Sequence, residues 1–437
     1  MDATTKRTFH NTILQLIRTF TPLYLALFLL LNLTLSTFGN LYAQSEETEL
    51  EEIIAIFSEE QIVVSALKKP RSVTKSPAIM SVITAKQIKQ MGFRTLVDVL
   101  KIVPGFYISM DETGERDIAV RGVLDDASQK IKVLIDGHSI NDPWRGGAMW
   151  NFDDLPVENI KRIEIIRGPG SALYGQNAFL AVVNIITKDT EDIDGFQFTT
   201  SGGNFETQNY NMLFGKEYGD LMISGFFDYY DTEGFSKKIE KDPISGDLLA
   251  SKAPGRSHNS RKKTDLNLKL SYNNLYVKGK YMKKRRKDYI GVGNALNDDT
   301  KLKDTYIYTE LIYKLALGEK LEITPKVYYD QYNFDPLFER RPDGFTASGG
   351  LAVYPDGIQG KTKFKQRTIG FENQVNYKMF DENELTFGFQ YEWMHQHDIK
   401  SAEFTFNPIT SAPLPFPQDF SKDLPFTRKA TRRYSRK

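Results

Sequence analysis

The sequence predicts a small α+β domain followed by antiparallel strands of a membrane-spanning β-barrel, and three observations carry that prediction. Residues 156–188, PVENIKRIEIIRGPGSALYGQNAFLAVVNIITK, join two apolar runs through a glycine-proline turn and a turn of small residues. From Gly195 onward, apolar and polar residues alternate as they do in strands with one apolar face. Short and long connections alternate between successive strands, which favours a membrane barrel over a β-sandwich.

The composition excludes several classes of protein. The chain has 437 residues, enough for two or three domains, and its 40% apolar content excludes a wholly disordered protein. Its 57 basic and 56 acidic residues nearly cancel, so we expect no nucleic-acid partner. The absence of cysteine excludes disulfides, thiol catalysis and cysteine-ligated zinc.

Residues 1–43 have the pattern of a signal peptide. Lys6, Arg7 and Arg18 are basic, an apolar run follows over 21–38, and a cleavage site after Ala43 ends the pattern. The apolar run is long enough that an uncleaved anchor is the alternative. We therefore expect export, with an acidic lead-in over residues 44–59.

The α+β domain is expected over residues 67–194. A strand over residues 79–83 precedes two short helices, each predicted by a capping box: Thr84 with Gln87, and Thr95 with Asp98. The second helix should end before Pro104-Gly105. The segments AVRG, at 119–122, and VLIDGHSIND, at 133–142, then lead to the stretch 156–188.

Taken in order over residues 60–190, these segments resemble the plug-domain signature of TonB-dependent outer-membrane receptors. The resemblance implies energy-coupled import of a scarce ligand, a ferric siderophore or cobalamin-like complex, at the outer membrane of a Gram-negative bacterium. It implies neither enzymatic activity nor a cofactor. A secreted or surface β-rich binding protein without transport activity is the alternative, because alternating strands and long loops would suit that class too.

The segment before the α+β domain resembles the family's Ton box, which binds a TonB-type periplasmic energy-coupling protein by strand addition. Five of its seven residues are β-branched or small, and it lies between an acidic and a basic segment; an ordinary edge strand is the alternative. The predicted Ton box consists of Glu60, Gln61, Ile62, Val63, Val64, Ser65 and Ala66.

The alternating region predicts about nine strands in a partial barrel over residues 195–400. Plugged barrels have about 22 strands, and the tail at 401–437 is rich in proline and predicted to be irregular. We therefore expect a truncated receptor or a fragment. The predicted strands lie near 196–202, 207–217, 221–231, 264–272, 275–289, 304–316, 320–333, 363–379 and 384–399.

The resemblance assigns a latch to two arginines, Arg121 and Arg167, which would pair with glutamates on the inner barrel wall and hold the plug closed. Glu310, Glu372 and Glu392 are the partners suggested by strand parity, and surface-exposed arginines are the alternative. The other residues assigned to plug structure are Gly122, Asp136, Gly137, Gly168, Pro169, Tyr174 and Gly175.

The resemblance places ligand contacts at the plug apex and the outer loops. It assigns them here to Trp144, Arg145, Trp150, Arg340 and Arg341. No sequence motif indicates a resident metal. Asp125-Asp126 and Asp153-Asp154 lack the repeated oxygen-ligand spacing of calcium sites and are predicted to be turn residues.

Two further clusters have more than one interpretation. His395 and His397 share one strand face and could bind metal or haem, although a polar lumen or rim position is the stronger expectation. The basic run 283–287, KKRRK, is predicted at the outer end of the fifth strand. There it could meet lipopolysaccharide phosphates and outer-membrane lipid, or an anionic ligand, or simply be solvated.

Overall fold

The computed structural model describes most of the chain after residue 77. The predicted signal peptide, the acidic lead-in and most of the predicted Ton box lie outside the described residues. None of the helices in the described part is long and apolar enough to cross a membrane. The described residues are 62–63, 71–72, 78–243, 245, 251–292, 295–347, 352–354, 357–380, 384–406, 413–419 and 432–436.

The α+β domain, residues 78–194, is built on a five-stranded sheet in the order β3-β8-β9-β6-β7. Strands β6 and β9 are parallel, and the other neighbours are antiparallel. Its strands are β3 (Met80–Thr84), β4 (Phe106–Met110), β5 (Arg116–Val120), β6 (Ile131–Ile135), β7 (His138–Ser139), β8 (Ile160–Ile166) and β9 (Ala181–Thr187). Its helices are α3 (Ala85–Gln90), α4 (Leu96–Leu100), the 3-10 turn η2 (Asp126–Ser128), α5 (Met149–Phe152), α6 (Ser171–Tyr174) and α7 (Thr190–Ile193).

Both predicted capping boxes are present. The Thr84 backbone N–H donates to the Gln87 side chain at 2.9 Å, and the Gln87 N–H donates to the Thr84 hydroxyl at 3.3 Å. Thr95 and Asp98 exchange the same pair of bonds. These side chains satisfy N–H groups that a short helix leaves unpaired, so each helix begins where its capping box predicts.

The glycine-rich turn between β8 and β9 explains the stretch 156–188. A Cβ on Gly170 would lie 2.6 Å from a methyl of Val182, and Gly175 has a φ of +67°. Only glycine therefore fits both positions without a shift of the neighbouring chain or strained backbone. The turn returns the chain into β9, whose side chains are almost all buried in the central sheet.

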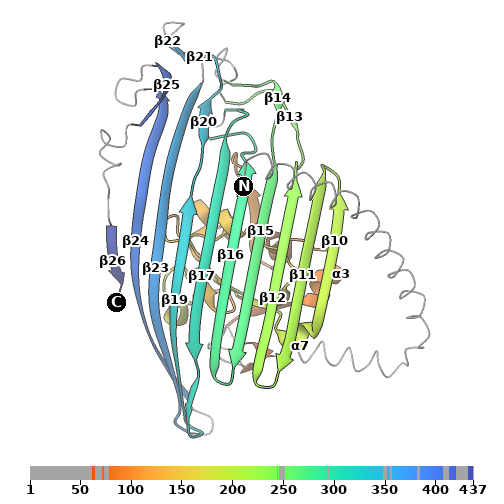
Figure 1. The fold of residues 1–437 in the computed structure, drawn as a ribbon, viewed down its shortest axis with the longest axis vertical. Coiled ribbons are helices and arrows are strands. Elements are labelled where there is room, and N and C mark those ends of the chain that lie inside the picture. Colours follow the sequence, from red (N-terminus) through yellow and green to blue (C-terminus); the bar gives the residue numbers. More distant parts are fainter. Residues whose placement is uncertain are drawn as a thin grey trace, which may run out of the picture. The chain divides into compact units, whose positions relative to one another are not determined.

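The second part is a long antiparallel sheet, called the wall here, in the order β10-β11-β12-β15-β16-β17-β19-β23-β24 with β25 beyond. Figure 1 shows these strands side by side, with the orange and yellow elements of the α+β domain behind them. Both parts belong to one compact unit, residues 60–437. The wall strands are β10 (Gly195–Gly203), β11 (Thr207–Tyr218), β12 (Leu221–Thr232), β15 (Arg261–Tyr272), β16 (Leu275–Lys287), β17 (Lys301–Tyr313), β19 (Leu321–Phe334), β23 (Ile358–Lys378) and β24 (Glu384–Phe406).

These strands confirm the nine predicted from alternation. Short strands add to the sheet: β18 (Leu315–Leu317) pairs with β19, β20 (Phe338–Arg341) pairs with β23, and β25 (Pro413–Asp419) and β26 (Arg432–Arg436) pair with β24. The tail was predicted to be irregular, whereas β24 extends to Phe406 and two further strands follow it. Three two-stranded ladders complete the described elements: β1 (Ile62–Val63) with β2 (Arg71–Ser72), β13 (Lys238–Ile239) with β14 (Gly255–Arg256), and β21 (Phe345–Ala347) with β22 (Ala352–Tyr354).

The two faces of the wall differ as the alternation predicts. On β15, Asp265 is fully buried against the α+β domain, whereas Leu266, Leu268 and Tyr272 are about half exposed. The face toward the domain also carries aromatic rings, and the ring of Phe152 in α5 meets Tyr306 of β17 edge-on at 5.2 Å. One side of the wall is therefore an outward apolar band, and the other is a mixed polar and aromatic seat for the α+β domain.

The connections alternate in length along the wall. Two-residue turns join β11 to β12 and β15 to β16, and their residues Gly219 and Asn273 have positive φ. Residues 233–260, 288–300 and 335–357 connect the opposite strand ends, which lie at the upper edge of Figure 1. The strand ends next to these connections are called the long-loop end below.

Candidate functional site: the interface between the α+β domain and the wall

An acidic pair at the end of α5 meets three wall cations. Lys284 Nζ lies 2.5 Å from Asp153 Oδ1 and 3.2 Å from Asp154 Oδ1, and Arg261 lies 2.9 Å from Asp153 Oδ2. Lys263 also donates to the Asp154 backbone carbonyl. Burial opposes ionisation of both aspartates, but wall cations outweigh it and lower the pKa of each carboxyl: mainly Arg261 and Lys284 for Asp153, and Lys263, Lys284 and Arg261 for Asp154. The pair is therefore a charged docking point as well as the turn that the sequence predicts.

His138, which directly follows the β6–β7 turn, makes the reverse kind of contact. His138 Nδ1 lies 3.0 Å from Glu310 Oε2, and His138 Nε2 lies 2.9 Å from Asp330 Oδ1. The imidazole stacks on Tyr308 with ring centroids 4.0 Å apart. Burial favours the neutral ring, but the two carboxylates outweigh it and raise the pKa of His138 from 6.5 to about 9. The ring is therefore mostly protonated at neutral pH.

Wall lysines bind the same turn through Asp136. Lys269 lies 3.0 Å from the Asp136 carboxylate, and Lys278 donates to the Asp136 backbone oxygen at 2.9 Å. The carboxylate also accepts from the backbone and hydroxyl of Thr187. Asp136 and Gly137 have positive φ, as the tight turn requires. Asp136 thus has the structural role predicted for it and contacts the wall besides.

Of the predicted ligand-binding residues, Trp150 is committed to the interface and Arg145 to contacts within the α+β domain. The guanidinium carbons of Arg145 and Arg286 lie 4.4 and 4.1 Å from the ring centre of Trp150, which is only 6% exposed. Arg145 also lies 2.6 Å from buried Glu115. Burial raises the pKa of Glu115 to about 8 even though both arginines oppose it. A ligand therefore cannot reach Trp150 or Arg145 without breaking these contacts.

The remaining predicted ligand contacts are more accessible. Trp144 is 46% exposed, although its ring packs against Phe334 and Phe364. Arg340 is exposed and Arg341 partly so, and the Arg341 guanidinium lies over the Phe345 ring. Arg341 also donates to the Arg340 backbone oxygen.

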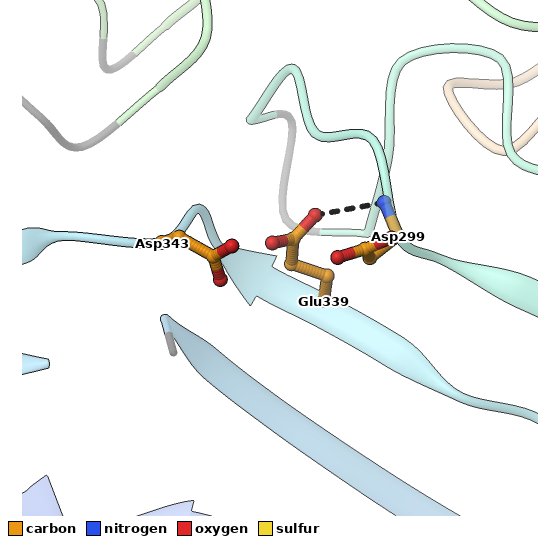
Figure 2. Close-up of side chains that lie close together, drawn as sticks. All are labelled: Asp299, Glu339 and Asp343. Carbon is orange, nitrogen blue, oxygen red and sulfur yellow. Dashed lines mark hydrogen bonds between the residues drawn. The ribbon is translucent and has the colours of Figure 1, made fainter. Parts of the chain in front are cut away.

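Three carboxylates gather near these arginines. Asp299, Glu339 and Asp343 each have an oxygen within 4.8 Å of the others (Figure 2). Glu339 is buried and accepts backbone N–H bonds from Asp298 and Asp299 at 3.0 and 2.9 Å. The backbone thus satisfies the buried carboxylate, and the cluster holds the loop together.

The predicted partners of the two arginines are wrong. Arg121, at φ 53°, donates to the Arg167 backbone oxygen at 2.7 Å, so the two arginines meet within the α+β domain. In the described part of the chain neither arginine forms an ion pair with the wall, and the three suggested glutamates have other partners. Glu310 binds His138 and Lys278, Glu372 binds Lys326, and Glu392 accepts from Tyr328.

The basic run 283–287 divides between the two wall faces. Lys284 and Arg286 are buried toward the α+β domain, whereas Lys283, Arg285 and Lys287 lie on the opposite face. Side chains alternate in a strand, so the period of two could have shown that half of this run points inward. His395 and His397 stack on each other at 5.2 Å and share the face of Trp393, not the lumen face of Glu392.

Only the middle of the predicted Ton box is described. Ile62 and Val63 pair antiparallel with Ser72 and Arg71. These two residues are therefore extended, as strand addition requires, and are paired along one edge.

Comparisons with known proteins match this architecture. Residues 72–182 match the family model of the TonB-dependent receptor plug domain. The vitamin B12 transporter BtuB of Vibrio vulnificus (strain CMCP6) is 33% identical over 192 residues, which cover 42% of this chain and 30% of that protein. The chain thus aligns with less than a third of this curated relative.

Solved receptors share the fold. The ferric preacinetobactin receptor BauA of Acinetobacter baumannii superposes with a TM-score of 0.57 at 13% identity, covering 82% of this chain and 53% of that one. The ferric-catecholate import receptor Fiu of E. coli K12 gives a TM-score of 0.53 at 14% identity, covering 78% and 53%. The α+β domain is therefore a plug domain of the TonB-dependent receptor type, and the wall has the fold of part of a receptor barrel.

Proposed function

We propose that this chain serves the energy-coupled import of a ferric siderophore or a cobalamin-like complex across the outer membrane of a Gram-negative bacterium. The observation that carries the proposal is the seat of the plug. Beside aromatic and apolar packing, its contacts with the wall include buried ion pairs, among them those of Asp153-Asp154 and His138. Water entering a lumen can resolvate charged groups as they separate, so such an interface can open and close again.

The Ton box, Glu60 to Ala66, would transmit the energy. A TonB-type periplasmic protein would add a strand to this segment, and pulling on it would displace or remodel the plug. Residues 62–63 are extended and paired, which suits that role. The contacts of Asp153-Asp154 and of His138 with the wall would act as the latch. Arg121 and Arg167 would stabilise turns within the plug.

The ligand would meet the plug apex and the outer loops. Trp144, Arg340 and Arg341 remain the proposed contacts, because they lie partly exposed near the long-loop end. An arginine pair suits an anionic chelate, and an exposed indole suits an aromatic or extended planar ligand.

Deleting residues 60–66 from the full receptor chain tests the proposal. Uptake of radiolabelled cobalamin or ferric siderophore by intact cells should fall to background, while binding at the cell surface stays unchanged. Deletion of residues 46–52 in the acidic lead-in is the matched control and should preserve uptake.

Two outcomes would contradict the proposal. Uptake that survives loss of residues 60–66 would remove this segment as the Ton box. Binding without energy-dependent uptake in the unaltered chain would favour the alternative, a surface binding protein without transport activity.

A further inference from the structure

The outward face of the wall carries a row of cations at one level of three adjacent strands. Lys262 of β15 lies directly opposite Arg285 of β16, and Arg285 lies directly opposite Lys303 of β17. We call Lys262, Arg285 and Lys303 the outer basic row. Lys283 and Lys287 flank Arg285 on the same face of β16, and Lys287 pairs in register with Lys301.

Like charges on directly opposed residues of neighbouring strands repel each other. Two acids reduce this repulsion at the ends of the row: Asp231 lies 2.7 Å from Lys262, and Asp335 lies 4.0 Å from Lys303 and 3.4 Å from Lys363. Arg285, in the middle, is exposed, and in the described part of the chain it forms no ion pair. The row thus lacks a counter-charge at its centre.

The position of the row within the strands shows what could supply that charge. Two residues farther from the long-loop end lies a level of Thr264, Lys283 and Thr305, and the next level is Leu266, Tyr281 and Ile307. From there the outward face is apolar down to the tight turns. The row therefore stands at the boundary of the apolar band, the depth at which the phosphates of a lipid leaflet lie.

The row also borders a groove. Its lining includes Lys262, Arg285, Lys287, Lys301, Lys303 and Lys361, together with the acids Asp231, Glu233 and Asp335. A guanidinium between two ammonium groups can bind a phosphate through two parallel N–H bonds while the lysines add point charges. Lys262 also lies over the Tyr229 ring, 5.2 Å from its centre, which orients its stem along the wall.

We propose that the outer basic row is a binding site for the phosphorylated headgroup of an outer-leaflet lipid. This proposal rests on the outer-membrane location proposed above, and it adds a specific contact between the wall and a lipid. On the inward face of the same run, Lys284 binds plug carboxylates and Arg286 lies over the Trp150 ring, so one strand would use alternate cations for the plug and for the membrane.

Lipid titration of the full receptor chain, purified in a nonionic detergent, tests the site. Bis-phosphorylated lipid A and its dephosphorylated form are compared by native mass spectrometry, with inorganic phosphate as a soluble competitor. The double variant Arg285→Gln and Lys303→Gln should bind the phosphorylated lipid roughly thirty-fold more weakly, because each basic residue at a membrane surface contributes about five-fold. The matched control, Lys216→Gln with Lys320→Gln, removes two exposed lysines near the tight turns and should bind as the unaltered protein does.

Thermal unfolding separates binding from a merely structural role. In detergent without lipid, Arg285→Gln should leave the unfolding temperature unchanged or raise it, because the change relieves repulsion. Phosphorylated lipid should raise the unfolding temperature of the unaltered chain and not that of Arg285→Gln.

Several results would overturn the proposal: equal binding of the two lipids, equal weakening in the control, displacement by phosphate at the lipid's own concentration, or a lower unfolding temperature for Arg285→Gln without lipid. Deletion of residues 60–66 should leave lipid binding unchanged. Loss of uptake and loss of lipid binding are therefore distinguishable.

Discussion

Two of the charged contacts between plug and wall have opposite polarity. At the end of α5 the plug supplies two carboxylates and the wall supplies three cations. At the β6–β7 turn the plug supplies one protonated imidazole and the wall supplies two carboxylates. Each contact is buried, so neither side tolerates loss of its partner.

The difference teaches that the contacts that hold the plug include two that fail under different conditions. The aspartate contact depends on carboxylates whose pKa is lowered, and it persists at any moderately high pH. The histidine contact depends on a proton that leaves at alkaline pH. The plug is therefore fastened most firmly between these limits.

The largest expected effect comes from removing the acidic pair. Asp153→Asn with Asp154→Asn keeps the side-chain shapes but removes the carboxylates that face three buried cations, of which Lys263 keeps Asp228 at 4.0 Å. We expect the free energy of local opening at α5, measured by hydrogen exchange, to fall by about 3–5 kcal/mol. Asp231→Asn, which breaks an exposed ion pair with Lys262, is the control and should change the free energy of opening by less than about 1 kcal/mol. Equal effects in the two variants would show that the pair is not a docking point.

A smaller effect is expected at the histidine. His138→Gln removes the positive charge, but glutamine can still donate one hydrogen bond and Glu310 keeps Lys278. Protection of the β6–β7 turn should fall by about 2 kcal/mol. His258→Gln is the matched control, because His258 is partly exposed and faces a single loop aspartate, Asp298. Unchanged protection in His138→Gln would remove this contact from the latch.

The pH dependence of the two contacts should differ in sign. The pKa of His138 is raised from 6.5 to about 9, so its stabilisation is complete below pH 6.5 and is lost as pH rises through about 9. The pKa of each aspartate is lowered from 3.8, so that stabilisation is present above pH 3.8 and is lost as pH falls further. Hydrogen exchange at pH 6.5 and 9.5, corrected for the intrinsic rate, should show loss of protection at β7 and not at α5. Parallel loss at both segments would contradict the assignment.

The smallest effect is expected at Arg121. Arg121→Gln removes one bond to the Arg167 backbone and no contact with the wall. Ion leakage through the closed receptor in planar bilayers should stay at the level of the unaltered chain. A large increase in leakage would restore the arginine latch that the family resemblance implies.

Local patterns predicted most of the fold. The Thr84 and Thr95 capping boxes mark the two helix starts. Alternation predicts the nine wall strands, because the side chains of a strand point to its two faces in turn and a one-residue slip would move every apolar side chain to the wrong face. Short turns such as Asn273-Asn274 fix the register between neighbouring strands. These signals lie within a few residues of one another, so a sequence displays them directly.

The pairing across the interface was harder to predict. His138 and Glu310 are 172 residues apart, and Asp153 and Lys284 are 131 apart. Strand parity correctly placed Glu310, Glu372 and Glu392 on the inner face, but parity carries no information about height along the strand. The arginine partners failed for that reason, and Trp150 was misassigned because its burial depends on Arg286 of a distant strand.

The short ladder between Ile62–Val63 and Arg71–Ser72 has a kinetic consequence. A strand arriving from another protein finds one side of Ile62–Val63 occupied by a ladder of only two residue pairs. It can dock on the vacant side or replace Arg71–Ser72 pair by pair, and in the second route each new backbone bond forms as an old one breaks. If a partner strand binds here as proposed, exchange of this kind keeps the number of backbone bonds constant, so Ile62–Val63 can be captured and released without first leaving its own ladder.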